Sequence, residues 1–152
     1  MTKEQRIYLD MCCFNRPYDD QTQARIHLET EAKLLLQQKV KSSECDLIWS
    51  SILDFECKNN PFEEHRHAIL QWRWLASAII LTNDSIIAQA KALEADGVGK
   101  FDALHVACAI SGQANIFVTT DDRLIKKMRK IGTLPTMLPG EAIAFIENWY
   151  EN

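Results

Sequence analysis

The sequence lacks the features that mark membrane, secreted and fibrous proteins. No apolar run approaches the roughly 20 residues that a membrane-spanning helix requires. Residues 2–9 have neither the basic start nor the long apolar stretch of a secretory signal. Glycine and proline are scarce, with five and four residues among 152, and no repeat, linker or low-complexity tract interrupts the chain. We therefore expect a globular, cytoplasmic protein without membrane contact.

The cysteine pattern and the charge exclude two further classes. The five cysteines, at positions 12, 13, 45, 57 and 108, form no Cys-x-x-Cys pair and have no spacing suited to zinc. Adjacent cysteines such as Cys12 and Cys13 rarely bridge each other, so we expect reduced thiols. The net charge of −4 argues against a protein that coats nucleic acid through bulk charge. A negative net charge does not exclude a local basic surface beside an acidic centre that binds cations.

Short apolar segments alternate with helix-forming segments along the chain. The predicted strands are 6–10, 46–50, 78–81, 115–118 and, less regularly, 133–138. The predicted helices are 21–39, 53–57, 62–77, 82–95, 102–112, a basic helix beginning at 121 or 122, and 140–150, with residues 17–20 read as a turn. This alternation predicts an α/β three-layer sandwich with a mainly parallel, Rossmann-like sheet of four or five strands. The length predicts a single domain over residues 1–152.

Four acidic residues fall where this architecture would bring them together. Asp10 ends the first strand, Asp121 follows the fourth, and Glu56 lies in the helix after the second. Asp102 opens an apolar helix, where an unpaired charge would be costly. The carboxyl ends of parallel strands meet at one edge of the sheet, so we expect the four carboxylates to converge. Two carboxylates about 5 Å apart repel by roughly 3 kcal/mol, and a bound Mg²⁺ or Mn²⁺ would remove that cost.

The choice of acids leaves alternatives open. Asp121 or Asp122 can be the fourth member, and either can instead serve only as a helix cap. Asp54 competes with Glu56 on a different face of the same helix. Asp10 has no lysine or arginine near it in sequence until Arg16, which favours a functional role for this carboxylate.

A basic stripe follows the fourth acid. Its spacing of i, i+3, i+4 and i+7 places Arg123, Lys126, Lys127 and Lys130 on one side of a helix. The stripe can guide a phosphate backbone towards the acidic centre, with Arg16 on the opposite wall. Alternatively, it is a solvated helix face whose late cations complement the helix dipole.

Three sequence blocks resemble the PIN domain family. They are IYLD at 7–10, FDALHVACA at 101–109 and VTTDDRL at 118–124, in the order found in that family and across nearly the whole chain. The resemblance implies an Mg²⁺- or Mn²⁺-dependent ribonuclease with Asp10, Glu56, Asp102 and Asp121 as its four acids. Cys12 departs from the family, in which an asparagine commonly follows the first Asp by two residues. His105 is typical of the family, and we expect it to be structural rather than catalytic.

The resemblance also implies partners. Many members are VapC-type toxins, so a small antitoxin whose arginine enters the acidic pocket is expected beside the RNA substrate. Water attack would leave a 5′-phosphate and a 3′-hydroxyl. The helix at 62–77 and the apolar tail at 142–149 are candidate homodimer surfaces, because Trp72 and Trp74 cannot share one helix face. The alternatives are a catalytically degenerate PIN-fold scaffold and an aspartyl phosphatase, which would need a second Asp where Cys12 stands.

Overall fold

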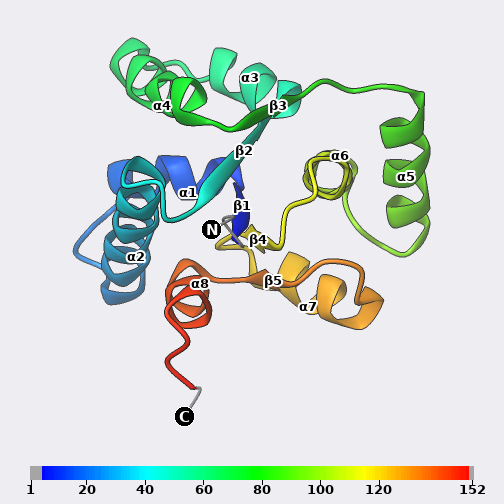
Figure 1. Cartoon of the computed structure of the whole chain (residues 1–152). Coiled ribbons are helices and arrows are strands. Elements are labelled where there is room, and N and C mark those ends of the chain that lie inside the picture. The colour runs from blue at the N-terminus through cyan, green and yellow to red at the C-terminus, as the bar shows by residue number, and fades with distance from the viewer. Residues whose placement is uncertain (1–4, 151–152) are drawn as a thin grey trace.

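Five parallel strands form the centre of the protein. The computed structural model describes residues 5–150. The strands are β1 (Arg6–Leu9), β2 (Asp46–Ser50), β3 (Ala78–Ile80), β4 (Ile116–Val118) and β5 (Thr136–Met137). Their order is β3-β2-β1-β4-β5, and every neighbouring pair is parallel (Figure 1). The predicted α/β sandwich with a parallel sheet is therefore confirmed.

Helices cover both faces of this sheet. In Figure 1, α2 and α8 lie on one side and α5 and α6 on the other. This arrangement explains why the central strands are apolar on both faces, since neither face meets water. The helices are α1 (Met11–Asn15), the short 3₁₀ helix η1 (Arg16–Tyr18), α2 (Ala24–Lys41), α3 (Ser51–Lys58), α4 (Glu63–Leu75), α5 (Asp84–Ala95), α6 (Lys100–Ser111), α7 (Asp122–Ile131) and α8 (Pro139–Ile146).

Polar caps end the strands and begin the following helices. The Oγ atom of Ser50 accepts a hydrogen bond from the amide of Leu53 (3.2 Å) and so begins α3 directly after β2. The carboxylate of Asp121 accepts from the first amides of α7 in the same way. At the other end of α7, Gly132 adopts a φ of 78°, which costs glycine little and lets the helix stop. Polar side chains are thereby concentrated at the carboxyl edge of the sheet.

Two local predictions were wrong. Residues 17 and 18, which were predicted to belong to a turn, lie in η1, and α1 occupies residues 11–15, for which no helix was predicted. The reason is that Asp10 caps α1, with its Oδ1 accepting from the amide of Met11 at 2.8 Å. The last helix ends at Ile146 rather than near residue 150, and Asn148 has a φ of 58°, which does not continue a helix.

Aromatic side chains fill the core beneath the site. Tyr8 stacks on Phe117, with ring centroids 5.2 Å apart, and Trp49 meets Phe14 edge-on at 5.3 Å. Both Tyr8 and Trp49 are fully buried. The five cysteines are all free thiols, as predicted.

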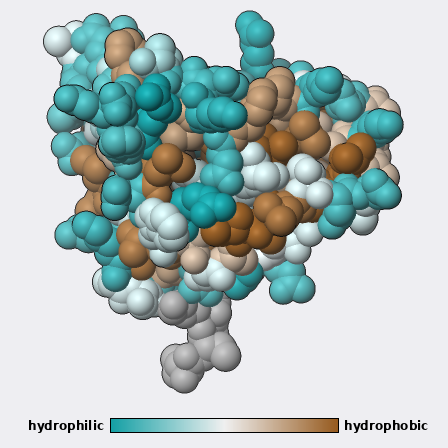
Figure 2. Space-filling view, turned by 90° about the horizontal axis from the view of Figure 1, so that it is seen from above, coloured by the Kyte–Doolittle hydropathy of each residue, from teal (hydrophilic) through white to brown (hydrophobic). Residues whose placement is uncertain are grey.

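Exposed apolar side chains gather at the β3 edge of the sheet. Figure 2 views the molecule from above, where this edge lies, and shows hydrophobic residues among polar ones. Trp74 on α4 is 76% exposed, and Leu75, Ile79 and Leu81 nearby are also exposed. Trp72, by contrast, is half-buried against the core, so the two tryptophans of α4 do face different surroundings, as the sequence predicted.

None of the helices between residues 5 and 150 combines the length and the apolar character needed to cross a bilayer.

Candidate metal centre

The candidate site lies at the switch point of the parallel sheet, where the strands added after β1 change from one side of β1 to the other. β1 is flanked by β2 on one side and by β4 on the other, so connections leave the sheet in opposite directions at the β1–β4 boundary. Ligands of open parallel sheets bind at such a switch point, beyond the carboxyl ends of the strands. Leu9 is in register with Val118 at the ends of β1 and β4. The residues that directly follow these two strands are Asp10 and Thr119.

Asp10 is held rigidly at this position. The residue is 7% exposed, and Oδ1 accepts the amide of Met11 at 2.8 Å. The other oxygen, Oδ2, accepts the hydroxyl proton of Thr119 at 2.9 Å. The amide of Asp10 donates to the carbonyl of Val118 (2.9 Å), which ties the carboxylate to the end of β4 as well as β1. These hydrogen bonds fix the position of the Asp10 carboxylate at the edge of the sheet.

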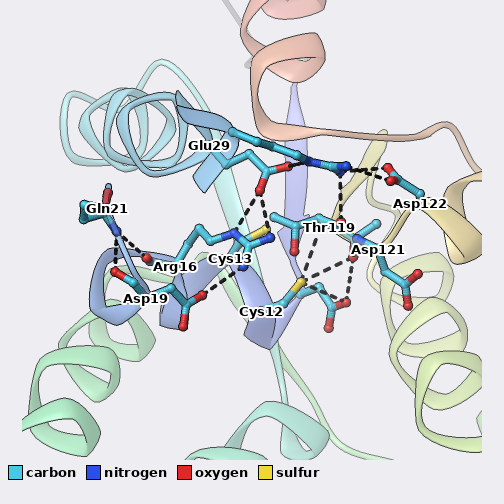
Figure 3. Close-up of polar contacts among 12 residues, drawn as sticks. Cys12, Cys13, Arg16, Asp19, Gln21, Glu29, Thr119, Asp121 and Asp122 are labelled. Atoms are coloured by element: carbon cyan, nitrogen blue, oxygen red, sulfur yellow. Dashed lines mark hydrogen bonds and ion pairs between the residues drawn. The ribbon is translucent and has the colours of Figure 1, made fainter. Parts of the chain in front are cut away.

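Cys12 fills the position where the PIN family commonly has asparagine. Its Sγ donates to Asp10 Oδ2 at 3.5 Å and accepts from the amide of Thr120 at 3.4 Å. The same sulfur lies 3.4 Å from Thr119 Oγ1. Figure 3 shows Cys12 and Thr119 side by side between α1 and the end of β4. The thiol therefore links the first acid to the loop that carries the fourth.

A buried hydrogen-bonded chain positions the second acid. His105 on α6 is 1% exposed and lies between two partners. Its Nε2 is 2.6 Å from Glu56 Oε1, and its Nδ1 is 2.6 Å from the hydroxyl of Tyr8. The Tyr8 hydroxyl also lies 2.6 Å from Ser50 Oγ. The ligand atoms of Asp10, Glu56 and His105 all lie within 4.8 Å of one another.

The protonation of His105 is set by this environment. Burial lowers its pKa, but the hydrogen bond that it donates to Glu56 and the charges of Asp10, Glu56 and Asp102 together outweigh burial, so the pKa is raised. The imidazolium that these acids favour also orients Glu56. His105 thus has a structural part, as predicted, and in addition contacts the acidic cluster directly.

Asp102 lies in the first turn of α6 and faces the other acids. It is only partly buried, less than its apolar sequence context suggested. Burial and the nearby charges of Asp10, Asp121 and Glu56 raise its pKa to about 6, against a smaller opposing effect of His105. A carboxylate whose neighbours raise its pKa in this way is crowded by negative charge, which is the condition that a bound dication relieves.

The two candidates for the fourth acid, Asp121 and Asp122, have different partners. The carboxylate of Asp122 is bound at 2.8 Å through both oxygens by the guanidinium of Arg25, and this hydrogen bond lowers its pKa. Asp121 acts electrostatically on Asp102 instead. Figure 3 shows the two carboxylates pointing to different sides. Asp54 is likewise engaged elsewhere, by Trp49 Nε1 (2.8 Å) and by an arginine of α4.

The predicted substrate residues divide into two groups. The α7 stripe is exposed, and none of its members forms an ion pair with any residue between 5 and 150; it comprises Arg123, Lys126, Lys127 and Lys130. Arg16 is different, because its guanidinium contacts Glu29 (2.8 Å) and Asp19 (2.9 Å). Figure 3 shows this group on the far side of Cys12 from Asp121. Arg16 therefore already has carboxylate partners.

Sequence reasoning did not single out Tyr8, Ser50 and Thr119. Each lies in or directly after an apolar strand, where residues of these types are common and indicate no function. A signal for Thr119 was present, since it precedes Asp121 by two residues in the block that resembles the PIN family. No local signal identified Tyr8, because its partner His105 is 97 residues away.

The comparisons with known proteins agree with this architecture. No protein-family model matches the sequence, and no curated protein matches it. Among solved structures, a chain of FitAcB from Neisseria gonorrhoeae matches with a TM-score of 0.59 and 13% identity, over 88% of this chain and 98% of that chain. A chain of VapBC-1 from nontypeable Haemophilus influenzae matches with a TM-score of 0.56 and 17% identity, over 90% and 99%.

A third structure extends the same finding. A chain of VapBC2 from Rickettsia felis, solved bound to a DNA fragment from their promoter, matches with a TM-score of 0.52 and 16% identity, over 87% of this chain and 97% of that chain. Such low identity carries information about the fold alone. The chain therefore has the PIN-like α/β fold that its sequence blocks indicated, in common with chains of FitAcB and VapBC.

Proposed function

We propose that the protein is a metal-dependent endoribonuclease of the VapC type that hydrolyses RNA phosphodiester bonds. The observation that carries this proposal is the acidic group at the switch point of the sheet. Ligand atoms of Asp10, Glu56 and His105 lie within 4.8 Å of one another, and the charges of Asp10, Asp121 and Glu56 add to burial in raising the pKa of Asp102. A bound dication would offset the repulsion among these carboxylates. The four acids are Asp10, Glu56, Asp102 and Asp121.

The donor set fits Mg²⁺ or Mn²⁺. Oxygen ligands suit these hard cations, and the one nearby nitrogen, His105 Nε2, is already bonded to Glu56. We propose that Asp10, Asp102 and Asp121 hold the cation, with Glu56 beside it. When bound, the cation would polarise the phosphoryl group and lower the pKa of the attacking water.

The side chains of this site supply the remaining steps. Glu56 is held through one oxygen by His105, so its other oxygen can accept the proton of the attacking water. Thr119 and Cys12 keep Asp10 in place through hydrogen bonds to Oδ2. Asp102 is the other candidate for orienting the water. Hydrolysis then breaks the bond between phosphorus and the 3′ oxygen, which takes up a proton to become a 3′-hydroxyl, and the phosphate stays on the 5′ oxygen of the downstream fragment.

The substrate path follows α7. This helix starts at Asp121 and carries Arg123, Lys126, Lys127 and Lys130 outward along an exposed face. Lysine and arginine contacts to phosphates supply affinity without reading sequence. We therefore propose that this stripe binds the phosphates of the RNA backbone. Arg16 is a weaker candidate for such a contact, because carboxylates already hold its guanidinium.

Two protein partners complete the proposal. By its resemblance to VapC-type toxins, and since the VapBC structures share its fold, the chain would pair in the cytoplasm with a small antitoxin whose arginine enters the acidic cluster. A second copy of the chain would cover the β3 edge, where Trp74, Leu75, Ile79 and Leu81 are exposed.

The direct test compares the protein with its Asp102→Asn variant. A mixed RNA pool is incubated with Mn²⁺, and the products are sized and their ends identified. We expect cleavage with 5′-phosphate ends by the unaltered protein, little cleavage by Asp102→Asn, and full cleavage by the control Asp122→Asn. Equal cleavage by all three proteins would remove the proposed centre.

A second measurement separates the nuclease from the scaffold alternative. Binding of Mn²⁺ without any RNA cleavage would favour a degenerate scaffold. Expression of the chain alone in bacteria tests the toxin role, and growth should be restored by Asp10→Ala.

A further inference from the structure

Three aromatic rings lie together next to the acidic cluster. Tyr18 of η1 stacks on His65 of α4, with ring centroids 3.7 Å apart and planes at 14°. Phe62, just before α4, approaches the same His65 ring at 4.9 Å with a tilt of 44°. Tyr18 is 44% and Phe62 60% exposed, so neither ring is core material. Two segments 44 residues apart therefore present aromatic faces to solvent at one place.

The aromatic rings and the acidic cluster open onto the same hollow. A cavity of about 330 Å³ is lined by Tyr18, Phe62, His65 and also by Glu56. Glu56 is thus bonded to His105 on its inner side and borders this cavity on its outer side. A strand whose phosphate lies at the acids would place an adjacent base in the hollow. The volume is at the lower end of the range for small-molecule sites.

The polar lining of the hollow suits a base better than a phosphate. Its charged side chains are Glu56 and Asp19, of which Asp19 is paired with Arg16 at 2.9 Å, and among residues 5–150 no lysine or arginine lines it. The carboxylate of Glu56 would repel a phosphate group there, whereas it would not repel an uncharged ring. Asn15, Asn59 and Asn60 also line the hollow. Side-chain amides both donate and accept hydrogen bonds, as the edges of nucleobases do.

We propose that Tyr18, Phe62 and His65 form a subsite that stacks one nucleobase of a single-stranded RNA, beside the bond that is cut. This inference rests on the proposed ribonuclease function and names the part of the substrate that is recognised. The α7 stripe binds the backbone, and the aromatic hollow selects the base next to the cleavage point. Base stacking on aromatic rings tolerates different bases but prefers those that stack strongly.

The experiment removes the rings one at a time. The variants are Tyr18→Ala, Phe62→Ala and Tyr18→Phe, which keeps the ring. Tyr150→Ala is the matched control, because Tyr150 is an exposed aromatic side chain that does not line the hollow. Cleavage sites are mapped on a randomised single-stranded RNA with Mn²⁺. Both alanine variants should raise KM roughly tenfold with little change in kcat, and should flatten the base preference beside the cut.

A binding assay gives a readout that does not depend on catalysis. Hexaribonucleotides carrying 2-aminopurine are titrated in an Asp102→Asn background, where stacking quenches the fluorescence. Quenching should persist with Tyr18→Phe and Tyr150→Ala, and fall with Tyr18→Ala and with Phe62→Ala. Two alanine variants guard against the possibility that one of them fails to fold, which circular dichroism detects.

The outcomes separate the subsite from the ribonuclease. Cleavage that keeps its base preference and quenching in both folded alanine variants would overturn the subsite and leave the nuclease intact. Ring-dependent quenching in a protein that cleaves no RNA would support the subsite while removing the catalytic proposal. Absence of quenching in the protein with all three rings present would also overturn the subsite.

Discussion

Replacing Asp102 by asparagine should stabilise the metal-free protein at neutral pH. Burial and the charges of Asp10, Asp121 and Glu56 raise the pKa of Asp102 from 3.8 to about 6. At 1.36 kcal/mol per pKa unit, the full shift corresponds to about 3 kcal/mol of unfavourable free energy. Asp102 is partly exposed, and solvent screening reduces this to about 1–2 kcal/mol.

The pH dependence of this gain has a definite sign. The pKa of Asp102 is higher in the folded state than in the unfolded state. The stabilising contribution of this residue to the free energy of unfolding is therefore fully present below about pH 4 and is lost as pH rises through about 6. The unaltered protein should therefore lose stability relative to Asp102→Asn between these values. The advantage of the variant should be largest at pH 7.5 and shrink as pH falls towards 4.

Urea unfolding in EDTA, followed by tryptophan fluorescence, measures the difference between the two proteins. Adding Mn²⁺ should reverse the ranking, because a ligand at 100 times its Kd stabilises the native state by about 2.7 kcal/mol and the variant lacks part of the site. The control is Asp122→Asn. Its carboxylate has a pKa lowered by Arg25, so this variant should gain nothing at neutral pH.

Two results would refute this reasoning. The first is an Asp102→Asn protein that is less stable than the unaltered one in EDTA at pH 7.5. The second is a pair of stability profiles that run parallel from pH 4 to 7.5. Either would mean that Asp102 is not crowded by like charges, and the argument for a cation at this site would lose its main support.

Four further measurements test other parts of the site. Thr119→Val removes the hydroxyl that donates to Asp10, and should weaken Mn²⁺ binding by about 1.5–3 kcal/mol in a calorimetric titration. Tyr8→Phe breaks the buried chain and should cost about 1–2 kcal/mol of unfolding free energy in urea, with kcat also reduced. Lys126→Ala should lower the slope of log affinity for RNA against log salt by about one; an unchanged slope would contradict a phosphate contact. Trp74→Glu should leave the melting temperature nearly unchanged and halve the molecular mass measured by light scattering. A monomeric mass for the unaltered protein would contradict a homodimer through the β3 edge.

Local signals in the sequence carried much of the fold. Strand composition and helix caps placed most elements within a few residues, and Asn83 and Ser50 begin their helices as their residue types suggest. The helix α1 was missed because its cap, Asp10, was assigned to the metal site alone. In the structure one oxygen of Asp10 does accept the amide of Met11. Asp10 was interpreted only as a metal ligand, so its second role as a helix cap was not predicted.

The sequence indicated candidate residues for the site and few of their contacts. It left Asp121 and Asp122 open, since both are good helix caps. The two differ in the structure through Arg25, which lies 97 positions from Asp122 and binds it at 2.8 Å. His105 was recognised by its motif, but its bond to Glu56 spans 49 residues.

The sequence by itself determined which segments are strands, which are helices, and that acids follow the strands, because periodicity and capping act over a few neighbouring residues. Only the tertiary structure decided the strand order β3-β2-β1-β4-β5, and with it the meeting of Asp10 and Thr119 at the switch point. Strand order is set by packing and hydrogen bonding between segments far apart in the chain, which no local pattern encodes.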